Sequence, residues 1–168
     1  MRLDVKASRE LLATIYAIRS LDKTLQKVIR QQTQRIAAPE WRKALAERAH
    51  TRLQQRVLVD TSVVTVSNQN IRIRSASKGR PLSGGFNPKT NYHAAEFGAD
   101  RNAKVTYDGF RGHKRFPVTR HTRRQLPARN REGLVFYPAA RDMVARLGSL
   151  LVQTTYRTIA NALEGKQG

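Results

Sequence analysis

The stretch VDTSVVTVSNQNIRIRS, residues 59–75, decides the fold because the spacing of apolar residues changes there. Val64 and Val66, and then Ile71 and Ile73, stand two positions apart, which is the period of a strand with one buried face. The two apolar runs are joined by Ser67-Asn68-Gln69-Asn70, and asparagine tolerates the positive φ of tight turns. The pattern predicts a β-hairpin near 62–76. Val57 and Val59, which are also two positions apart, predict an earlier start of the strand region.

Helical periodicity precedes this hairpin. Over residues 8–37 the apolar side chains recur at three- and four-residue steps, which is typical of a helix with one buried face. Ser20 and Asp22 allow a break, so one long helix and two shorter helices both remain open. Pro39 predicts the end of this element and the start of the next, because proline suits the first turn of a helix and not its interior. A second apolar stripe then predicts a helix to about Arg56.

The chain after the hairpin alternates between loops and short elements. Glycine and proline make residues 77–91 a predicted loop. Apolar triplets at 105–107 and 116–118 predict two short strands of a second hairpin. Residues 134–137 predict a final strand or an extended lead into a C-terminal helix, which Pro138 opens.

This order of elements predicts an α+β fold in one domain. Strands grouped between helices favour helices packed on one face of a small, mostly antiparallel sheet. A chain of 168 residues is most simply a single domain. Its expected parts are a helical region at 8–56, a hairpin and loop at 57–99, a long basic loop or arm at 100–132, and a strand and C-terminal helix at 133–164.

Composition limits the classes of function. The chain carries a net charge of +20 and has no cysteine, which excludes disulfides and thiolate metal sites. No apolar run approaches the roughly 20 residues needed to span a bilayer, and the first six residues lack the apolar core of a signal peptide. A soluble protein made in the cytoplasm, without a membrane partner, is therefore expected.

The strongest signal is the charge between Asp100 and Glu132, where ten Lys or Arg face three Asp or Glu. Such an arm suits a polyanion or an acidic protein surface. Tyr107, Phe110 and Phe116 are interleaved with the cations and would also suit stacking on single strands. A solvated basic loop, or an arm docked on an acidic neighbour, remains open. The cations predicted to contact such an anionic partner are Arg101, Lys104, Arg111, Lys114, Arg115, Arg120, Arg123, Arg124, Arg129 and Arg131.

Residues with catalytic or metal-binding potential are few. The histidines, at positions 50, 93, 113 and 121, are too widely spaced for the ligand pairs of a zinc site. Glu96 stands alone in a segment poor in acid, and an ion pair with an arginine, within the chain or across a subunit interface, is the preferred interpretation over a catalytic carboxyl. Ser83-Gly84-Gly85 lacks the spacing of a phosphate-binding loop, and no catalytic triad is recognisable. We expect no enzymatic activity and no cofactor.

Three patches of the sequence, taken in chain order, carry a resemblance to one known family. The first is Val59-Asp60-Thr61-Ser62, where the family typically shows Val-Asp-Thr-Gly. The second is Tyr92-His93-Ala94-Ala95-Glu96-Phe97-Gly98-Ala99, close to Tyr-Ala-x-x-Val-Glu-Phe-Gly-Thr. The third joins Leu126-Pro127-Ala128-Arg129 to Phe136-Tyr137-Pro138-Ala139, near Pro-Ala-Arg-Pro-Phe-Leu-Arg-Pro-Ala. Together they resemble the tail-component family of the head–tail joining module, similar in role to minor tail protein Z of lambda-like phages.

The resemblance covers about residues 8–163 and has two departures. Ser62 replaces a glycine, which changes the conformational freedom of the turn. The second and third patches are nearly adjacent in many relatives but are separated here by a long insertion, positions 100–125, and that extension belongs to the basic arm.

What the resemblance implies is a non-enzymatic virion protein that forms a ring at the neck or the head-proximal end of the tail. A ring of six or twelve copies around the DNA channel, in contact with neighbouring neck or tail-tube proteins, is expected. The expected subunit contacts are Tyr92, Glu96, Phe97 and Gly98. The ten cations of the basic arm are expected to contact DNA in the channel or a neighbouring ring. Replacing Glu96 by alanine is then expected to impair assembly and leave the monomer folded. The alternative is a cytoplasmic protein that binds nucleic acid independently of sequence.

Overall fold

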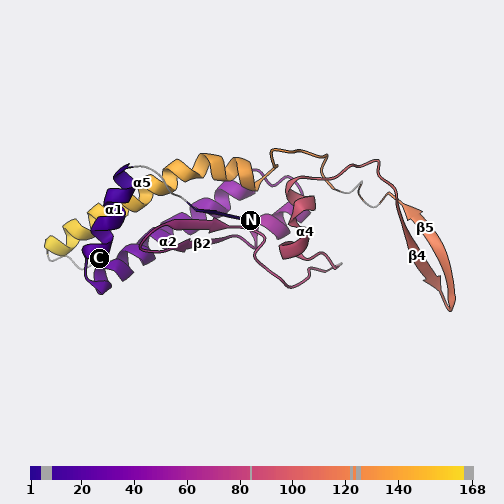
Figure 1. The fold of residues 1–168 in the computed structure, drawn as a ribbon, viewed down its shortest axis with the longest axis horizontal. Coiled ribbons are helices and arrows are strands. Elements are labelled where there is room, and N and C mark those ends of the chain that lie inside the picture. The colour runs from indigo at the N-terminus through magenta and orange to yellow at the C-terminus, as the bar shows by residue number, and fades with distance from the viewer. Residues whose placement is uncertain (5–8, 84, 122, 124–125, 165–168) are drawn as a thin grey trace.

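The computed structural model describes residues 1–4, 9–83, 85–121, 123 and 126–164. Its elements combine helices with two small antiparallel sheets, so the predicted α+β fold is confirmed (Figure 1). In chain order they are β1 (Arg2–Asp4), α1 (Arg9–Ser20), α2 (Lys23–Ala46), α3 (Arg52–Gln54), the π-helix η1 (Gln55–Val59), β2 (Val63–Val66), β3 (Ile71–Arg74), α4 (Pro88–Glu96), β4 (Val105–Arg111), β5 (Lys114–Arg120) and α5 (Phe136–Leu163).

The N-terminal helical region is two helices, the second of the two alternatives that the sequence left open. Helix α1 ends at Ser20, and α2 begins after Asp22. A carboxylate oxygen of Asp22 accepts a hydrogen bond from the backbone N–H of Thr24 at 3.2 Å. This cap satisfies one of the free amides at the start of α2.

Pro39 neither ends nor starts a helix, so that prediction was wrong. Helix α2 runs through it to Ala46. Proline removes one intrahelical hydrogen bond, which leaves the carbonyl of Arg35 without its amide partner. Both Arg35 and Pro39 are exposed, so water can hydrate that carbonyl. The predicted second helix, to about Arg56, is in fact the end of α2, the separate short helix α3 and the first two residues of η1.

The first strand does not include Val57 and Val59, which is a second correction. Both lie in η1, where Val57, Leu58 and Val59 are all buried. Three consecutive buried residues are incompatible with a strand that has one solvated face. The amide of Asp60 donates to the carbonyl of Gln55 at 3.0 Å and closes the wide turn of the π-helix.

The predicted hairpin is confirmed, with β2 and β3 joined at Ser67–Asn70. Strand β1, which the sequence did not predict, pairs with the other edge of β3, giving the order β1-β3-β2. Alternate residues of the hairpin are buried, namely Val64, Val66, Ile71 and Ile73.

The main core lies between this sheet and the long helices. Helices α2 and α5 pack on each other, α2 contacts β2, and α5 contacts β3, while α1 lies against α5. Trp41 of α2 and Phe136 of α5 are fully buried and meet edge to face with 5.4 Å between ring centroids. The indole N–H of Trp41 donates to the carbonyl of Arg74 at 3.3 Å. One tryptophan therefore ties both long helices to the sheet.

Helix α3 begins with a capping box, which gives a first prediction. The Thr51 hydroxyl accepts from the Gln54 amide at 3.1 Å, and the Gln54 side chain accepts from the Thr51 amide at 3.1 Å. We expect Thr51→Ala to lower the free energy of unfolding by about 1 kcal/mol, since one helix-start amide loses its acceptor. Thr51→Ser keeps the acceptor and should stay close to wild type in urea denaturation. Equal losses in both variants would contradict the capping role.

Two further expectations for the second half need correction. The predicted loop at 77–91 is a loop only to Asn87, whose side chain caps α4. Residues 134–137 form neither a strand nor a long lead, because α5 already begins at Phe136. No helix among the described residues is long and apolar enough to cross a membrane.

Candidate functional site

The second hairpin stands away from the body of the molecule (Figure 1). Strands β4 and β5 pair from Val105 opposite Arg120 to Arg111 opposite Lys114. The predicted short strands at 105–107 and 116–118 are confirmed and extended to seven residues each. The basic segment is therefore an arm with a defined two-stranded shape.

The root of the arm is closed by backbone contacts. Ala99 and Ala128 form a parallel bridge, and the Ala99 amide donates to the carbonyl of Pro127 at 3.0 Å. The amide of Asn130 donates to the carbonyl of Phe97 at 2.9 Å. We call this contact of residues 96–99 with residues 127–137 the clasp. Because of it, the chain leaves the body after Ala99 and returns to it at Pro127, at the same place.

Gly98 lies inside the clasp and has little room. Its φ is +65°, a conformation that residues with a side chain rarely adopt. A Cβ atom there would lie 2.5 Å from the carbonyl oxygen of Pro127 and would overlap the carbonyl oxygen of Ala128. The close approach of the two segments thus depends on the absence of a side chain.

Glu96 has a different environment from the one predicted. It is fully buried, and its carboxylate accepts hydrogen bonds from the amides of Val135, Phe136 and Tyr137 at 2.8–3.3 Å. These amides open α5, which has no side-chain cap of its own. A carboxylate is favourable at a helix N-terminus because the free amides and the helix dipole both attract negative charge. The expected ion pair with an arginine of a neighbouring subunit is therefore wrong.

Gly133 completes the pocket around this carboxylate. It is buried with a φ of +85°, and a Cβ there would overlap a carboxylate oxygen of Glu96 and lie 2.9 Å from the ring of Tyr137. The amide of Leu134, next in the chain, donates to the carbonyl of Glu96 at 2.9 Å. Main chain and side chain of Glu96 are both engaged within this protein.

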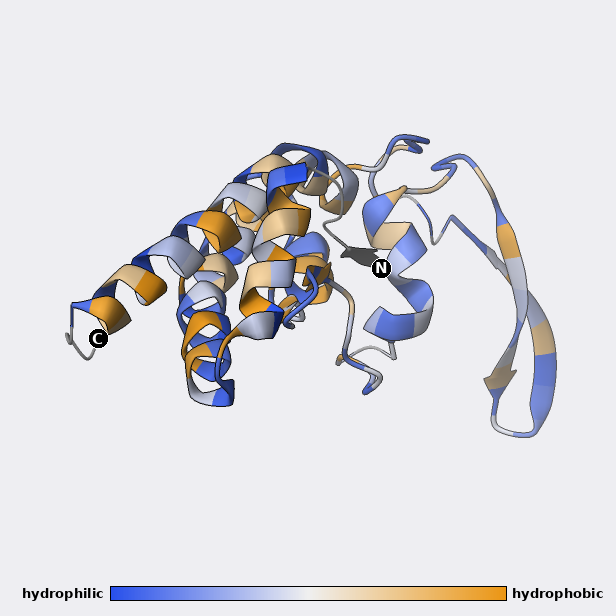
Figure 2. Cartoon of the chain, turned by 60° about the vertical axis from the view of Figure 1, so that its left-hand side comes forward, coloured by the Kyte–Doolittle hydropathy of each residue, from blue (hydrophilic) through white to orange (hydrophobic). Residues whose placement is uncertain are grey.

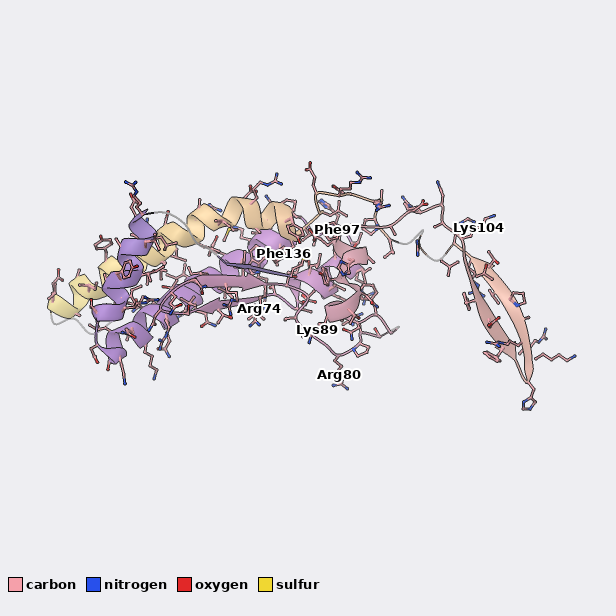
Figure 3. All side chains as sticks on the ribbon, in the orientation of Figure 1. Arg74, Arg80, Lys89, Phe97, Lys104 and Phe136 are labelled. Carbon is pink, nitrogen blue, oxygen red and sulfur yellow. The ribbon has the colours of Figure 1, made fainter. Side chains whose placement is uncertain are left out.

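Aromatic side chains surround the clasp. Between ring centroids, Phe97 lies 5.6 Å from Tyr137 and 6.4 Å from His93, and His93 lies 3.9 Å from Tyr92. Figure 3 shows Phe97 near the start of α5, where Tyr137 lies. Tyr92 and Phe97 are each half-buried. Of the four predicted subunit contacts, Gly98 is partly exposed as well, although it also serves the clasp, whereas Glu96 is fully buried.

The cations of the arm are exposed in every described case. Lys104 lies at the base of the hairpin in Figure 3. Arg115 pairs with Asp108 at 2.8 Å, and no other cation of the arm has a carboxylate partner among the residues described. Arg124 lies outside those residues. The exposed cations are Arg101, Lys104, Arg111, Lys114, Arg115, Arg120, Arg123, Arg129 and Arg131.

Cationic side chains also lie on the body, for example Arg74 on β3, Arg80 in the loop and Lys89 on α4 (Figure 3). Across the described part of the chain, no three His, Asp or Glu residues gather to hold a metal ion. The arrangement offers a cationic, projecting hairpin on a cationic body. What it can do chemically is bind anionic surfaces.

Sequence reasoning found the arm but missed the clasp. Nothing local in the sequence connects Glu96 with the start of α5, because the whole arm lies between them in the chain. The only signal was the pair of motifs around Glu96-Phe97-Gly98 and Pro127-Ala128. These motifs are nearly adjacent in many sequences of the resembled family, which predicts that the two segments lie close together in space. Comparisons with protein-family models, with curated proteins and with solved structures found no match.

Proposed function

We propose that this chain is a structural virion protein of a tailed bacteriophage, a neck or tail-completion component that joins head to tail around the DNA channel. The observation that carries the proposal is the clasp. The second and third family-like patches are separated in the sequence by positions 100–125, yet Ala99 and Ala128 pair. The extension therefore loops out as an arm and leaves the two patches next to each other, as they are in the sequences of many relatives.

The arm fits a protein that meets its partners through repeated copies. In a closed ring every subunit would present its hairpin at an equivalent place. Cations that face outward without partners would contact the phosphate backbone without reading sequence. That property suits a conduit through which DNA must slide. The same hairpin could instead reach an adjacent ring or tail-tube protein.

The subunit contacts proposed for this ring differ from those expected from the sequence. Tyr92 and Phe97 remain candidates because both keep exposed surface beside the clasp. Gly98, which is partly exposed too, stays in the set, whereas Glu96 is removed because its carboxylate is fully buried on the amides of α5. The proposed protein is made in the host cytoplasm and resides in the virion.

The test is negative-stain imaging of the purified protein together with its mass in solution. We expect closed rings with a central hole and the mass of six or twelve chains, because a ring at the neck has cyclic symmetry. The mass should be measured over a range of salt concentrations, so that charge repulsion between subunits is screened. A monomer at every protein and salt concentration, with no ring on addition of a head or tail, would contradict the proposal.

A second function has one observation in its favour. The body carries many cations of its own in addition to the arm, and the whole chain has a net charge of +20. A cytoplasmic protein that binds nucleic acid independently of sequence needs this charge and no ring. It would be monomeric and would bind DNA or RNA with an affinity that falls steeply with salt.

A further inference from the structure

The two faces of the β4–β5 hairpin differ in chemistry. Residues directly opposite each other in an antiparallel pair project from the same face. One face therefore carries Thr106, Asp108, Phe110, Arg115, Pro117 and Thr119. We call it the closed face, because its polar groups bind one another. The hydroxyls of Thr106 and Thr119 lie 2.8 Å apart, and Arg115 binds Asp108 and lies 5.9 Å from the ring of Phe110.

The opposite face, which we call the open face, has no such pairing. It carries Val105, Tyr107, Gly109, Arg111, Lys114, Phe116, Val118 and Arg120. A Cβ atom on Gly109 would lie 2.7 Å from a methyl group of Val118 and 3.1 Å from the ring of Phe116. The Phe116 ring thus extends over the glycine. Figure 2 shows hydrophobic segments alternating with hydrophilic ones along both strands.

Rings and cations on the open face lie in a defined order. Arg111 and Lys114 face each other at the tip, and Arg120 lies at the base. Between them, Tyr107 and Phe116 are diagonal neighbours across the strands. The Cα atoms of such neighbours are typically roughly 7–8 Å apart. Each ring is 43% exposed. The three cations have no carboxylate partner among the described residues, so the face combines bare rings with uncompensated positive charge.

Charge decides what can cover this face. Of the 32 Lys or Arg and 12 Asp or Glu in the chain, ten and three lie in the arm, which leaves 22 and nine for the rest. A second copy of this protein is therefore cationic both in its arm and in its body, and it would repel the open face. The occupant has to supply negative charge beside flat apolar groups.

We propose that the open face binds single-stranded nucleic acid, with bases stacked on Tyr107 and Phe116 and phosphates bound by Arg111, Lys114 and Arg120. A single strand offers unstacked bases and phosphates together, and aromatic stacking does not require a particular base. A duplex keeps its bases inside the helix, so only its phosphates would reach the cations. The inference rests on the anion-binding role given to the arm under the proposed function and names its ligand.

The test measures binding of a fluorescent oligothymidylate of about 12 nucleotides, a duplex of the same length, and heparin, a polyanion without bases. The variant Tyr107→Leu/Phe116→Leu keeps apolar bulk over Gly109 and removes both rings. We expect its affinity for the single strand to fall about tenfold or more, since each stacked base contributes on that scale. Its affinity for duplex and heparin should change less than about twofold, because every charge is retained.

Matched controls compare the two faces. Phe110→Leu removes the most exposed ring of the hairpin, at 70%, and should leave single-strand affinity within about twofold of wild type, because that ring is on the closed face. Lys114→Ala should lower the slope of log affinity against log salt by about 0.7 for the single strand. Its neighbour Arg115→Ala should leave the slope nearly unchanged, because Arg115 lies on the closed face and binds Asp108 instead of a phosphate.

Circular dichroism and the mass in solution are recorded for every variant, so that loss of folding is separated from loss of stacking. Tyr107→Trp/Phe116→Trp changes the same two positions but keeps an aromatic ring at each. It should retain single-strand affinity, which checks that binding requires the rings. The proposal would be overturned if Tyr107→Leu/Phe116→Leu lost equal affinity for all three ligands, or if Phe110→Leu lost as much single-strand affinity as that double variant. It would also be overturned if Tyr107→Leu/Phe116→Leu kept its single-strand affinity but had a reduced oligomer mass, which would assign the open face to a protein neighbour.

These outcomes are independent of the ring assembly. If the wild type forms rings but shows no preference for single strands that depends on Tyr107 and Phe116, this inference fails and the proposed function stands. If the protein stays monomeric and shows that preference, the inference stands and the ring proposal fails.

Discussion

Replacement of Glu96 by alanine is expected to destabilise the monomer strongly. The carboxylate accepts hydrogen bonds from three amides at the start of α5 while fully buried, and the N-cap residue of that helix, Val135, provides no side-chain cap. We expect the free energy of unfolding to fall by about 3 kcal/mol, because buried amides are left without acceptors and the helix dipole loses its counter-charge. Urea denaturation followed by circular dichroism measures the change.

The matched control is Glu132→Ala, which also removes one carboxylate near the clasp. Glu132 is exposed, so its loss should change stability by less than about 0.5 kcal/mol. Glu96→Gln keeps one acceptor oxygen but replaces the other with a side-chain N–H₂ group, which cannot accept a hydrogen bond from the backbone amides. Its stability should lie between those of wild type and Glu96→Ala. Wild-type stability in Glu96→Ala would show that water or a neighbouring group replaces the carboxylate.

This result would also change how Glu96 is used as a probe. The sequence suggested a folded monomer with impaired assembly, because the residue was expected to bind an arginine of a neighbouring subunit. The structure places the carboxylate on the amides of its own chain, so an assembly defect in Glu96→Ala would follow from a damaged monomer. Half-exposed positions beside the clasp, such as Phe97, are better probes of subunit contact.

Local patterns predicted the elements that local forces determine. The alternation in residues 63–74 and the three- to four-residue steps in α1 and α2 follow directly from one-sided burial. The strand predicted at Val57 and Val59 was wrong because two apolar residues two positions apart occur both in a strand and in a short, fully buried π-helix. Pro39 misled because a helix can keep a proline where the freed carbonyl faces water.

The candidate site divides in the same way. The cations and rings of the arm are visible in the sequence, since charge needs no partner to be recognised. Which ring shares a face with which cation depends on the register of β4 against β5, set by the two-residue turn at Gly112-His113. The clasp depends on segments that lie on opposite sides of the arm in the chain, and single-sequence patterns carry no information on such contacts.

Gly98→Ala should have an effect of similar size to the loss of Glu96, for a steric reason. The new Cβ would meet two backbone carbonyl oxygens, of Pro127 and Ala128, and neither can move as a flexible side chain would. The φ of +65° adds strain for any residue with a Cβ. We expect a loss of about 3 kcal/mol, since strain and overpacking each contribute on the order of 1–3 kcal/mol.

Gly85→Ala separates the two causes. Gly85 also has a positive φ, +81°, but no atom lies within 4 Å of the place that a Cβ would take, so the variant carries the strain without the clash. It should lose about 1 kcal/mol. Hydrogen exchange adds the spatial test: in Gly98→Ala the amides of Ala99 and Asn130, which bind across the clasp, should lose protection more than the amides of β2 and β3. Equal stability losses in the two variants would mean that the segments separate at little cost, and the arm would then have no fixed root.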